Sequence, residues 1–152
     1  MRKLLGLDLG DSKVGVAISD ELGYTAQGML TFRRRSLWSD MQFIEKLVAQ
    51  HQIEEVVIGL PLKMNGTNSS QTEKVLDFCK ELSKHVRVPV RTWDERLTTV
   101  QAMKILKHHR IRRKHHAPLV DKVAAVIILQ GYLDRKSLER EWAEFERSDA
   151  AP

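Results

Sequence analysis

Apolar positions at the start of the chain follow the alternation of a strand. Leu5, Leu7 and Leu9 fall on one face of this stretch, whereas Asp8 falls on the other. Residues 13–19 repeat the apolar pattern after a Gly-Asp-Ser turn signal, so the two stretches predict a hairpin. Both faces of the first strand are almost free of charge, which is typical of a central strand covered on two sides. Asp8 is the exception, because a buried carboxylate is costly unless it is paired or holds a cation.

The pattern then alternates between the periods of strands and helices. Strands are expected over residues 24–32, 56–60 and 86–92, and helices over residues 37–48, 75–82, 100–106 and 119–133. Three strands therefore precede alternating helices and strands, which predicts an α/β protein with a mixed sheet and helices on both faces. Pro89 places the last strand at an edge, and the apolar residues of 119–133 predict a helix buried nearly all round.

Length and composition indicate one globular domain. We assign residues 1–133 to it and residues 134–152, where charged side chains dominate, to a helical tail that frays toward its end. The single cysteine and the start of the chain, which has no signal-peptide layout, favour a cytoplasmic protein that does not enter a membrane. The net charge of +5 favours polyanionic partners.

Polar residues that follow the predicted strands are the candidate functional residues. The loop after residue 60 carries Lys63, Asn65 and Thr67, and such loops line the functional crevice of an α/β sheet. Glu95 and Arg96 follow the last strand, where Arg96 either binds a phosphate or forms a salt bridge at the sheet edge.

The segment from Lys104 to His116 is the densest basic stretch of the chain. Its spacing of histidines matches no structural zinc site, so we interpret it as a polyanion-binding helix end and loop rather than a metal site. The candidate phosphate contacts within it are Arg110, Arg112, Arg113 and Lys114.

Three acidic residues lie where the predicted topology brings chain segments together. Asp8 ends the first strand, Glu95 follows the last strand, and Asp121 lies at the start of the apolar helix. Converging carboxylates repel one another unless hard cations lie between them, and Mg²⁺ or Mn²⁺ prefers such oxygen ligands. Two such ions can support phosphodiester hydrolysis.

Four segments of the sequence resemble the YqgF (RuvX-type) family. They are Leu7-Asp8-Leu9-Gly10 with Val14-Gly15-Val16-Ala17, Val57-Ile58-Gly59-Leu60-Pro61-Leu62, Asp94-Glu95-Arg96-Leu97-Thr98-Thr99 and Asp121-Lys122-Val123-Ala124-Ala125. The resemblance implies an RNase H-like fold, here a five-stranded sheet with three antiparallel strands followed by two parallel ones. It also implies a nuclease that trims the 5′ end of pre-16S rRNA during ribosome biogenesis, with Asp8, Glu95 and Asp121 as catalytic metal ligands. Lys13, Lys63 and Asn65, which we assign to nucleic-acid binding, depart from the arginine, asparagine and aspartate expected in many relatives.

Other functions remain open at this point. The same fold and metal site suit a Holliday junction resolvase acting on branched DNA, and a silent nucleic-acid-binding module would share the fold. Actin-like and sugar-kinase ATPases also open with an Asp-x-Gly hairpin, but they need two such lobes. We expect RNA as the main partner, association with ribosomal precursor particles, and a monomer or weak homodimer.

Overall fold

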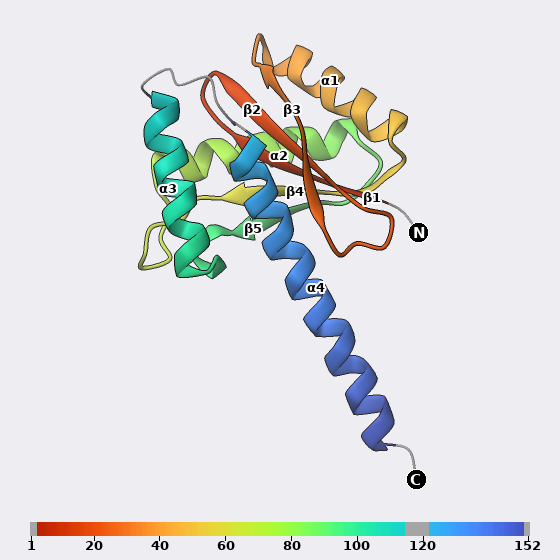
Figure 1. Cartoon of the computed structure of the whole chain (residues 1–152). Coiled ribbons are helices and arrows are strands. Elements are labelled where there is room, and N and C mark those ends of the chain that lie inside the picture. The colour runs from red at the N-terminus through yellow and green to blue at the C-terminus, as the bar shows by residue number, and fades with distance from the viewer. Residues whose placement is uncertain (1–2, 115–121, 151–152) are drawn as a thin grey trace.

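The computed structural model of the chain describes residues 3–114 and 122–150 and has a five-stranded mixed sheet at its centre (Figure 1). The strands are β1 (Lys3–Leu9), β2 (Lys13–Ser19), β3 (Ala26–Arg33), β4 (Ile53–Leu60) and β5 (Val90–Asp94). Their spatial order is β3-β2-β1-β4-β5. The first three are antiparallel, and β4 and β5 extend the sheet in parallel. The expected sheet is therefore confirmed, including the edge positions of β3 and of β5 after Pro89.

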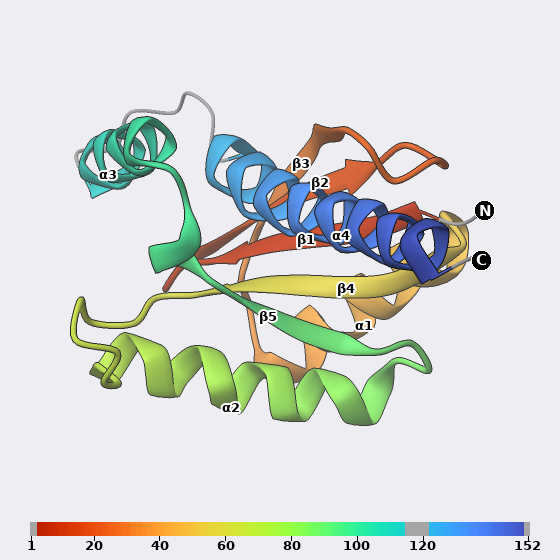
Figure 2. The same ribbon diagram turned by 90° about the horizontal axis from the view of Figure 1, so that it is seen from below.

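Helices cover both faces of this sheet, as expected. Helices α1 (Leu37–Gln50) and α2 (Ser70–His85) pack on one face, and α3 (Val100–Lys114) and α4 (Lys122–Ala150) lie on the other side (Figure 2). A short 3₁₀ helix, η1 (Glu95–Leu97), links β5 to α3. Among residues 3–114 and 122–150, no helix is long and apolar enough to cross a membrane.

Polar side chains fix where these helices begin. Ser36 accepts a hydrogen bond from the backbone of Ser39 at the start of α1, and Ser69 and Thr72 form a capping box on α2. Thr99 accepts from the backbone of Ala102 in the first turn of α3. These bonds satisfy backbone N–H groups that have no partner within the helix.

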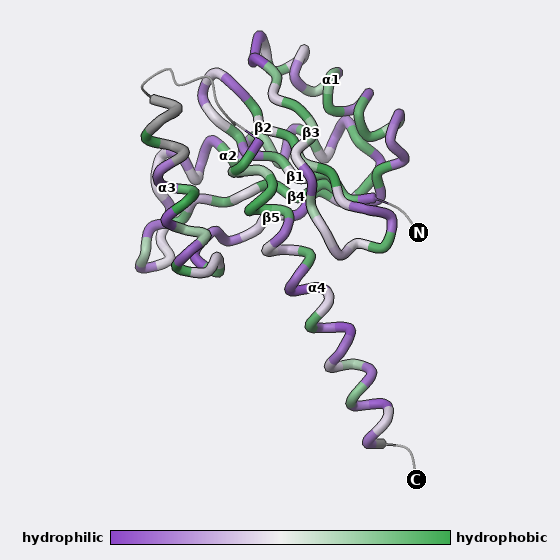
Figure 3. Tube along the Cα trace, in the orientation of Figure 1, coloured by the Kyte–Doolittle hydropathy of each residue, from purple (hydrophilic) through white to green (hydrophobic). Residues whose placement is uncertain are grey.

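The side chains of β1 contribute to two separate apolar cores, which Figure 3 shows as hydrophobic segments along the central strands. Leu5 and Leu7 pack with α1 and α2, whereas Leu4 packs with Ala125 and Leu129 of α4. Residue alternation along β1 therefore assigns each position to a face. Asp8, an even-numbered position, belongs to the α4 face.

Helix α4 differs from the expected arrangement in two ways. Five of the residues 122–133 are buried and the other seven are partly exposed, so the burial of this stretch is less complete than expected. The helix also continues without a break past Leu133 to Ala150, so the charged tail is an extension of the same helix (Figure 1). The expected helical form of the tail is confirmed, but the tail and the buried helix form one continuous element instead of two.

A buried polar cluster fastens α4 to the start of β4. The Glu55 carboxylate, 7% exposed, accepts a hydrogen bond from the Tyr132 hydroxyl and a bond of 2.8 Å from Lys136 Nζ. Arg91 Nε lies 3.5 Å from the same carboxylate. Burial and the neighbouring Glu55 raise the pKa of Tyr132 above its ordinary value. This cluster holds the helix at the point where it leaves the sheet.

Candidate active site

Asp8 lies at the carboxyl end of β1 between two glycines on neighbouring strands. Gly15 of β2 is its cross-strand partner. On the other side, Leu7 pairs with Ile58, so the following residues, Asp8 and Gly59, lie side by side. The Asp8 side chain is 2% exposed. Because neither neighbour has a side chain, other elements can approach the backbone on both sides of this buried carboxylate.

Glu95 extends its carboxylate into the space above Gly59. A Cβ atom built on Gly59 would lie 2.9 Å from Glu95 Oε1 and 2.5 Å from Ile128 Cδ1 of α4. Glu95 therefore lies on the α4 face, and it is 4% exposed. Its carboxylate stands above the strand next to Asp8, and neighbouring strands are about 4.8 Å apart. The structure thus brings together two carboxylates that lie 87 positions apart in the sequence.

The predicted third carboxylate, Asp121, lies outside the described residues. It immediately precedes Lys122, the first residue of α4, in the sequence. Within the described part of the chain, no three His, Cys, Asp or Glu side chains are grouped closely enough to hold a metal ion. Asp8 and Glu95 nevertheless supply buried oxygen ligands on one face, which is the donor chemistry that Mg²⁺ and Mn²⁺ prefer.

Arg96 points away from this pair and binds Asp94. Its Nη2 and Nε atoms lie 2.7 Å and 3.1 Å from the Asp94 carboxylate oxygens, and its backbone N–H donates to the same carboxylate at 3.0 Å. These bonds to Arg96 lower the pKa of Asp94 and raise the pKa of Arg96. The salt bridge considered for Arg96 at the sheet edge is present, with Asp94 as its partner, and binding of a phosphate by Arg96 stays a prediction.

The loop after β4 is folded on itself beside Arg96. Gly66 has a positive φ of 86° and closes a turn with Lys63, and Arg96 Nη1 would lie 3.1 Å from a Cβ at this glycine. The Asn65 side-chain oxygen accepts bonds from the backbone and hydroxyl of Thr67 at 3.1 Å and 2.6 Å. Asn65 therefore shapes the loop through its oxygen, whereas the Lys63 side chain is exposed at the same end of the sheet.

Two cationic residues lie on β2 and β3, on the other side of β1 from Glu95. Lys13 and Arg33 are cross-strand partners on β2 and β3, and they share the α4 face with Gly15 and its partner Thr31. Like charges directly opposite each other destabilise a sheet pair. This pair of cations is therefore a candidate binding feature for an anion.

Arg34, the middle residue of the Arg33–Arg35 run, has a structural role that the sequence did not predict. Its Nε donates to the buried Asp40 carboxylate at 2.9 Å, and its Nη1 donates to the Gly10 carbonyl at 3.2 Å. The guanidinium also lies 5.3 Å from the ring centre of Phe78. Arg34 thus connects α1 and α2 to the turn that immediately follows β1, and so helps to position Asp8.

The basic segment that begins at Lys104 is helical as far as Lys114, where a helix end and a loop were expected. Lys104, Lys107 and His108 are exposed. Arg110, Arg112, Arg113 and Lys114 lie in the last turns of α3, and their side chains lie outside the described part of the structure, so their assignment as phosphate contacts stays a prediction.

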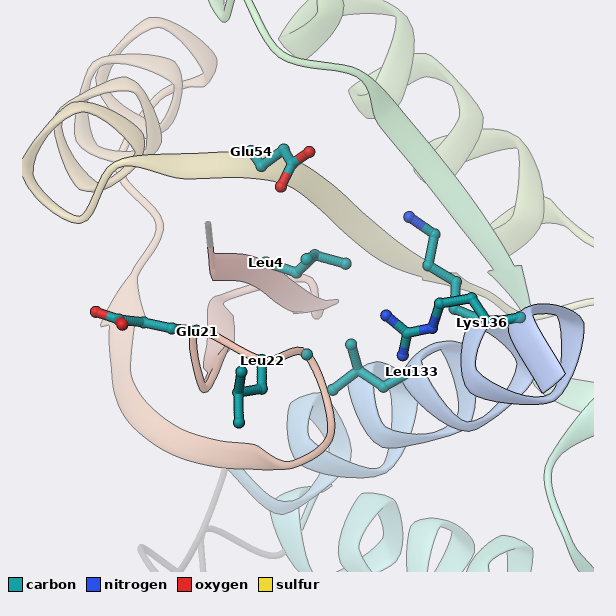
Figure 4. A pocket seen from close by; sticks show the side chains of 8 residues that line it. Leu4, Glu21, Leu22, Glu54, Leu133 and Lys136 are labelled. Carbon is teal, nitrogen blue, oxygen red and sulfur yellow. The ribbon is translucent and has the colours of Figure 1, made fainter. Parts of the chain in front are cut away.

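A separate hollow lies at the other end of the sheet. A cavity of about 360 Å³ is lined by Leu4, Glu21, Leu133 and Lys136, among others (Figure 4). Leu4 and Asp8 belong to the same strand but lie toward opposite ends of it. The cavity is therefore distinct from the site formed by Asp8 and Glu95.

Comparisons with solved structures define the class of fold. RuvC from Thermus thermophilus, solved with a Holliday junction substrate, superposes with a TM-score of 0.56 at 13% identity, covering 86% of this chain and 92% of RuvC. The fowlpox virus Holliday junction resolvase superposes with a TM-score of 0.50 at 12% identity, covering 88% of this chain and 99% of that one. The expected RNase H-like fold of RuvC-type resolvases is confirmed.

The chain belongs to the RuvX family, described as Holliday junction resolvase, which matches residues 2–135. A relative from Clostridium botulinum is 47% identical over 135 residues, covering 89% of this chain and 98% of the relative, and is named "Putative pre-16S rRNA nuclease". A relative from Clostridium novyi carries the same name and is 46% identical over 132 residues, covering 87% and 98% of the two chains. Membership of this family argues against the actin-like and sugar-kinase ATPases considered from the sequence.

Proposed function

We propose that this chain is a divalent-metal-dependent nuclease that processes the 5′ end of pre-16S rRNA. The observation that carries the proposal is the position of the Glu95 carboxylate above Gly59, one strand from Asp8 on the same face of the sheet. Family membership supports nuclease chemistry, and the names of relatives 46–47% identical to this chain support the RNA substrate.

Asp8, Glu95 and Asp121 are the residues that would hold the metal. Asp8 is fixed by the centre of the sheet, and Glu95 by the turn of η1, so both ligands belong to rigid elements. A divalent cation at this point would supply Lewis-acid activation of the scissile phosphodiester. Asp121, which precedes Lys122 in the sequence, enters the set through the family resemblance.

Cationic side chains around the site would bind the nucleic-acid backbone. Lys13 and Arg33 lie on the Asp8 face of the sheet, and Lys63 extends from the loop beyond β4. Helix α3 adds further positive charge on the same side of the sheet as α4 (Figure 2). Phosphate contacts of this kind orient a strand without selecting its sequence. Recognition of a particular substrate sequence or structure therefore depends on other contacts.

Cleavage of two substrates side by side tests the function. Purified protein with Mg²⁺ is incubated with a precursor 16S rRNA fragment and, separately, with a four-way DNA junction. We expect metal-dependent cleavage of the RNA, abolished by Asp8→Asn and by Glu95→Gln. Preferential cleavage of the junction would favour a Holliday junction resolvase, and tight binding without any cleavage would favour a non-catalytic module.

A further inference from the structure

The end of α4 carries an apolar stripe that nothing in the described structure covers. Leu138, Trp142 and Phe145 are 51%, 58% and 60% exposed. Their spacing of i, i+4 and i+7 places them on one face of the helix. The Trp142 and Phe145 rings contact each other edge to face, with centroids 5.8 Å apart, so the stripe is a continuous surface.

This stripe faces away from the body of the protein. Lys136 reaches Glu55, and the Arg140 guanidinium lies 5.5 Å from the centre of the Tyr24 ring, so the opposite face of α4 is the one that contacts the sheet and the loop between β2 and β3. Beyond these contacts the helix projects from the globular part (Figure 1). The family match ends at residue 135, so the stripe lies on an addition to the shared nuclease domain.

Carboxylates border the stripe on both sides. At 100° per residue, Glu139 and Glu146 fall along one edge and Glu141 along the other. Arg135 falls near the first edge and its Nε lies 3.6 Å from Glu139 Oε1, so each edge keeps an excess of one carboxylate. The cations Lys136, Arg140 and Arg147 fall on the opposite face of the helix. The stripe is therefore an apolar strip between two acidic edges, although the chain as a whole has a net charge of +5.

This charge arrangement selects among the surfaces that can cover the stripe. Nucleic acids and anionic membranes would be repelled by the carboxylates. A second copy of the helix would place glutamate edges against glutamate edges, which opposes pairing. A protein surface with an apolar groove bordered by lysine and arginine matches both the stripe and its edges.

We propose that the end of α4 is a docking helix for a basic partner protein, with Leu138, Trp142 and Phe145 inserted into an apolar groove of that partner. Aromatic side chains in the centre of an interface commonly dominate its binding energy. Docking would hold the nuclease domain next to a basic, RNA-associated protein while its catalytic edge stays free. The proposal does not depend on the nuclease assignment, because binding at this helix is measured without cleavage.

A pair of designed peptides tests this docking helix on the full chain. Both are amphipathic helices with leucine along one face; one has lysine at the flanking positions and the other has glutamate. Binding of each fluorescein-labelled peptide is measured by anisotropy. We expect the lysine peptide to bind at least about tenfold more tightly than the glutamate peptide, because only its flanks complement the acidic edges.

Variants separate specific docking from general charge attraction. Trp142→Ser with Phe145→Ser should abolish binding of the lysine peptide, whereas Trp38→Ser, which removes a 69% exposed tryptophan from α1, should not change it. Glu139→Gln with Glu141→Gln and Glu146→Gln should weaken binding and reduce its salt dependence. Undiminished binding by the Trp142/Phe145 variant would overturn the proposal. Self-association of the chain that is lost in this variant would also overturn it, because the occupant would then be a second copy.

Discussion

The Glu95 carboxylate occupies the space that a side chain at Gly59 would fill. A Cβ atom at Gly59 would lie 2.9 Å from Glu95 Oε1. Glu95 therefore extends over β4 toward Asp8 only because β4 has a glycine at this position. A glycine in the middle of a buried strand weakens the strand, and here the missing side chain makes room for a functional one.

Gly59→Ala should therefore damage activity more than its effect on stability explains. The added methyl group displaces Glu95 and also presses on Ile128, which should cost about 1–3 kcal/mol of unfolding free energy. The double variant Gly59→Ala with Ile128→Val removes Cδ1, the atom of α4 nearest to the new methyl group, but leaves the clash with Glu95. Thermal melting and nuclease assays on both variants should show partial recovery of stability without recovery of cleavage. Recovery of both would mean that the position of Glu95 is not critical.

Arg33 and Arg34 are neighbours in sequence, but we predict that loss of Arg34 lowers stability and that loss of Arg33 weakens RNA binding. Arg34→Met leaves the buried Asp40 carboxylate without its main cation, which should destabilise the protein by about 3 kcal/mol. Arg33→Met removes an exposed side chain and should change stability by less than about 0.5 kcal/mol. It should, however, weaken RNA binding and make its salt dependence shallower by about 0.7 in log–log slope. Chemical denaturation and binding titrations on both variants check this, and an equal loss of stability would refute the distinction.

The Asp94–Arg96 pair should stabilise the fold only above acidic pH. The pKa of Asp94 is lowered in the folded protein, so the stability it contributes is present above its unfolded value of 3.8 and is lost as pH falls through the folded value. Asp94→Asn should melt at a lower temperature than wild type at pH 7, with the difference shrinking as the pH falls below about 4. The pair is partly exposed, so the loss at pH 7 should be at most about 4 °C. A difference that does not shrink as the pH is lowered from 7 through the acidic range would contradict this explanation.

The substitution Arg96→Lys tests the role of the Asp94–Arg96 pair in a second way. If Arg96 acts through Asp94 and the loop, the substitution should lower melting temperature and turnover together. A loss of turnover at unchanged stability would instead indicate direct contact with the substrate phosphate.

The raised pKa of Tyr132 predicts how the polar cluster that joins α4 to Glu55 responds to alkaline pH. Its pKa is raised in the folded state, so its contribution to stability is complete below the unfolded value of 10.0 and is lost as pH rises toward the folded value. Wild type should lose melting temperature between pH 9 and about pH 11 more steeply than Tyr132→Phe. Melting curves recorded over this range check the prediction, and parallel curves for the two proteins would contradict it.

Sequence patterns were sufficient for the sheet, because alternation and apolar runs report burial directly. They assigned Asp8 to a buried strand end and Glu95 to the end of the last strand, and the structure places both on one face. They missed the roles of Gly59 and Arg34, because these depend on contacts with α4 and with the Gly10 turn that no local pattern encodes. They also indicated a helical tail after Leu133 but not its continuity with the buried helix, because the change from apolar to charged residues reports the end of burial and not the end of the helix.

The thermal shift caused by Mn²⁺ tests directly whether Asp8 and Glu95 bind a divalent metal ion, and the measurement needs no knowledge of the substrate. If Asp8 and Glu95 hold a divalent ion, Mn²⁺ at about a hundred times its dissociation constant should stabilise wild type by about 2.7 kcal/mol. For a chain of this size that is roughly 5–11 °C in melting temperature. Asp8→Asn and Glu95→Gln should lose most of this shift, whereas the exposed, distant Glu144→Gln should keep it. A shift in Asp8→Asn as large as that of wild type would contradict the account, because Asp8 would then not be a metal ligand.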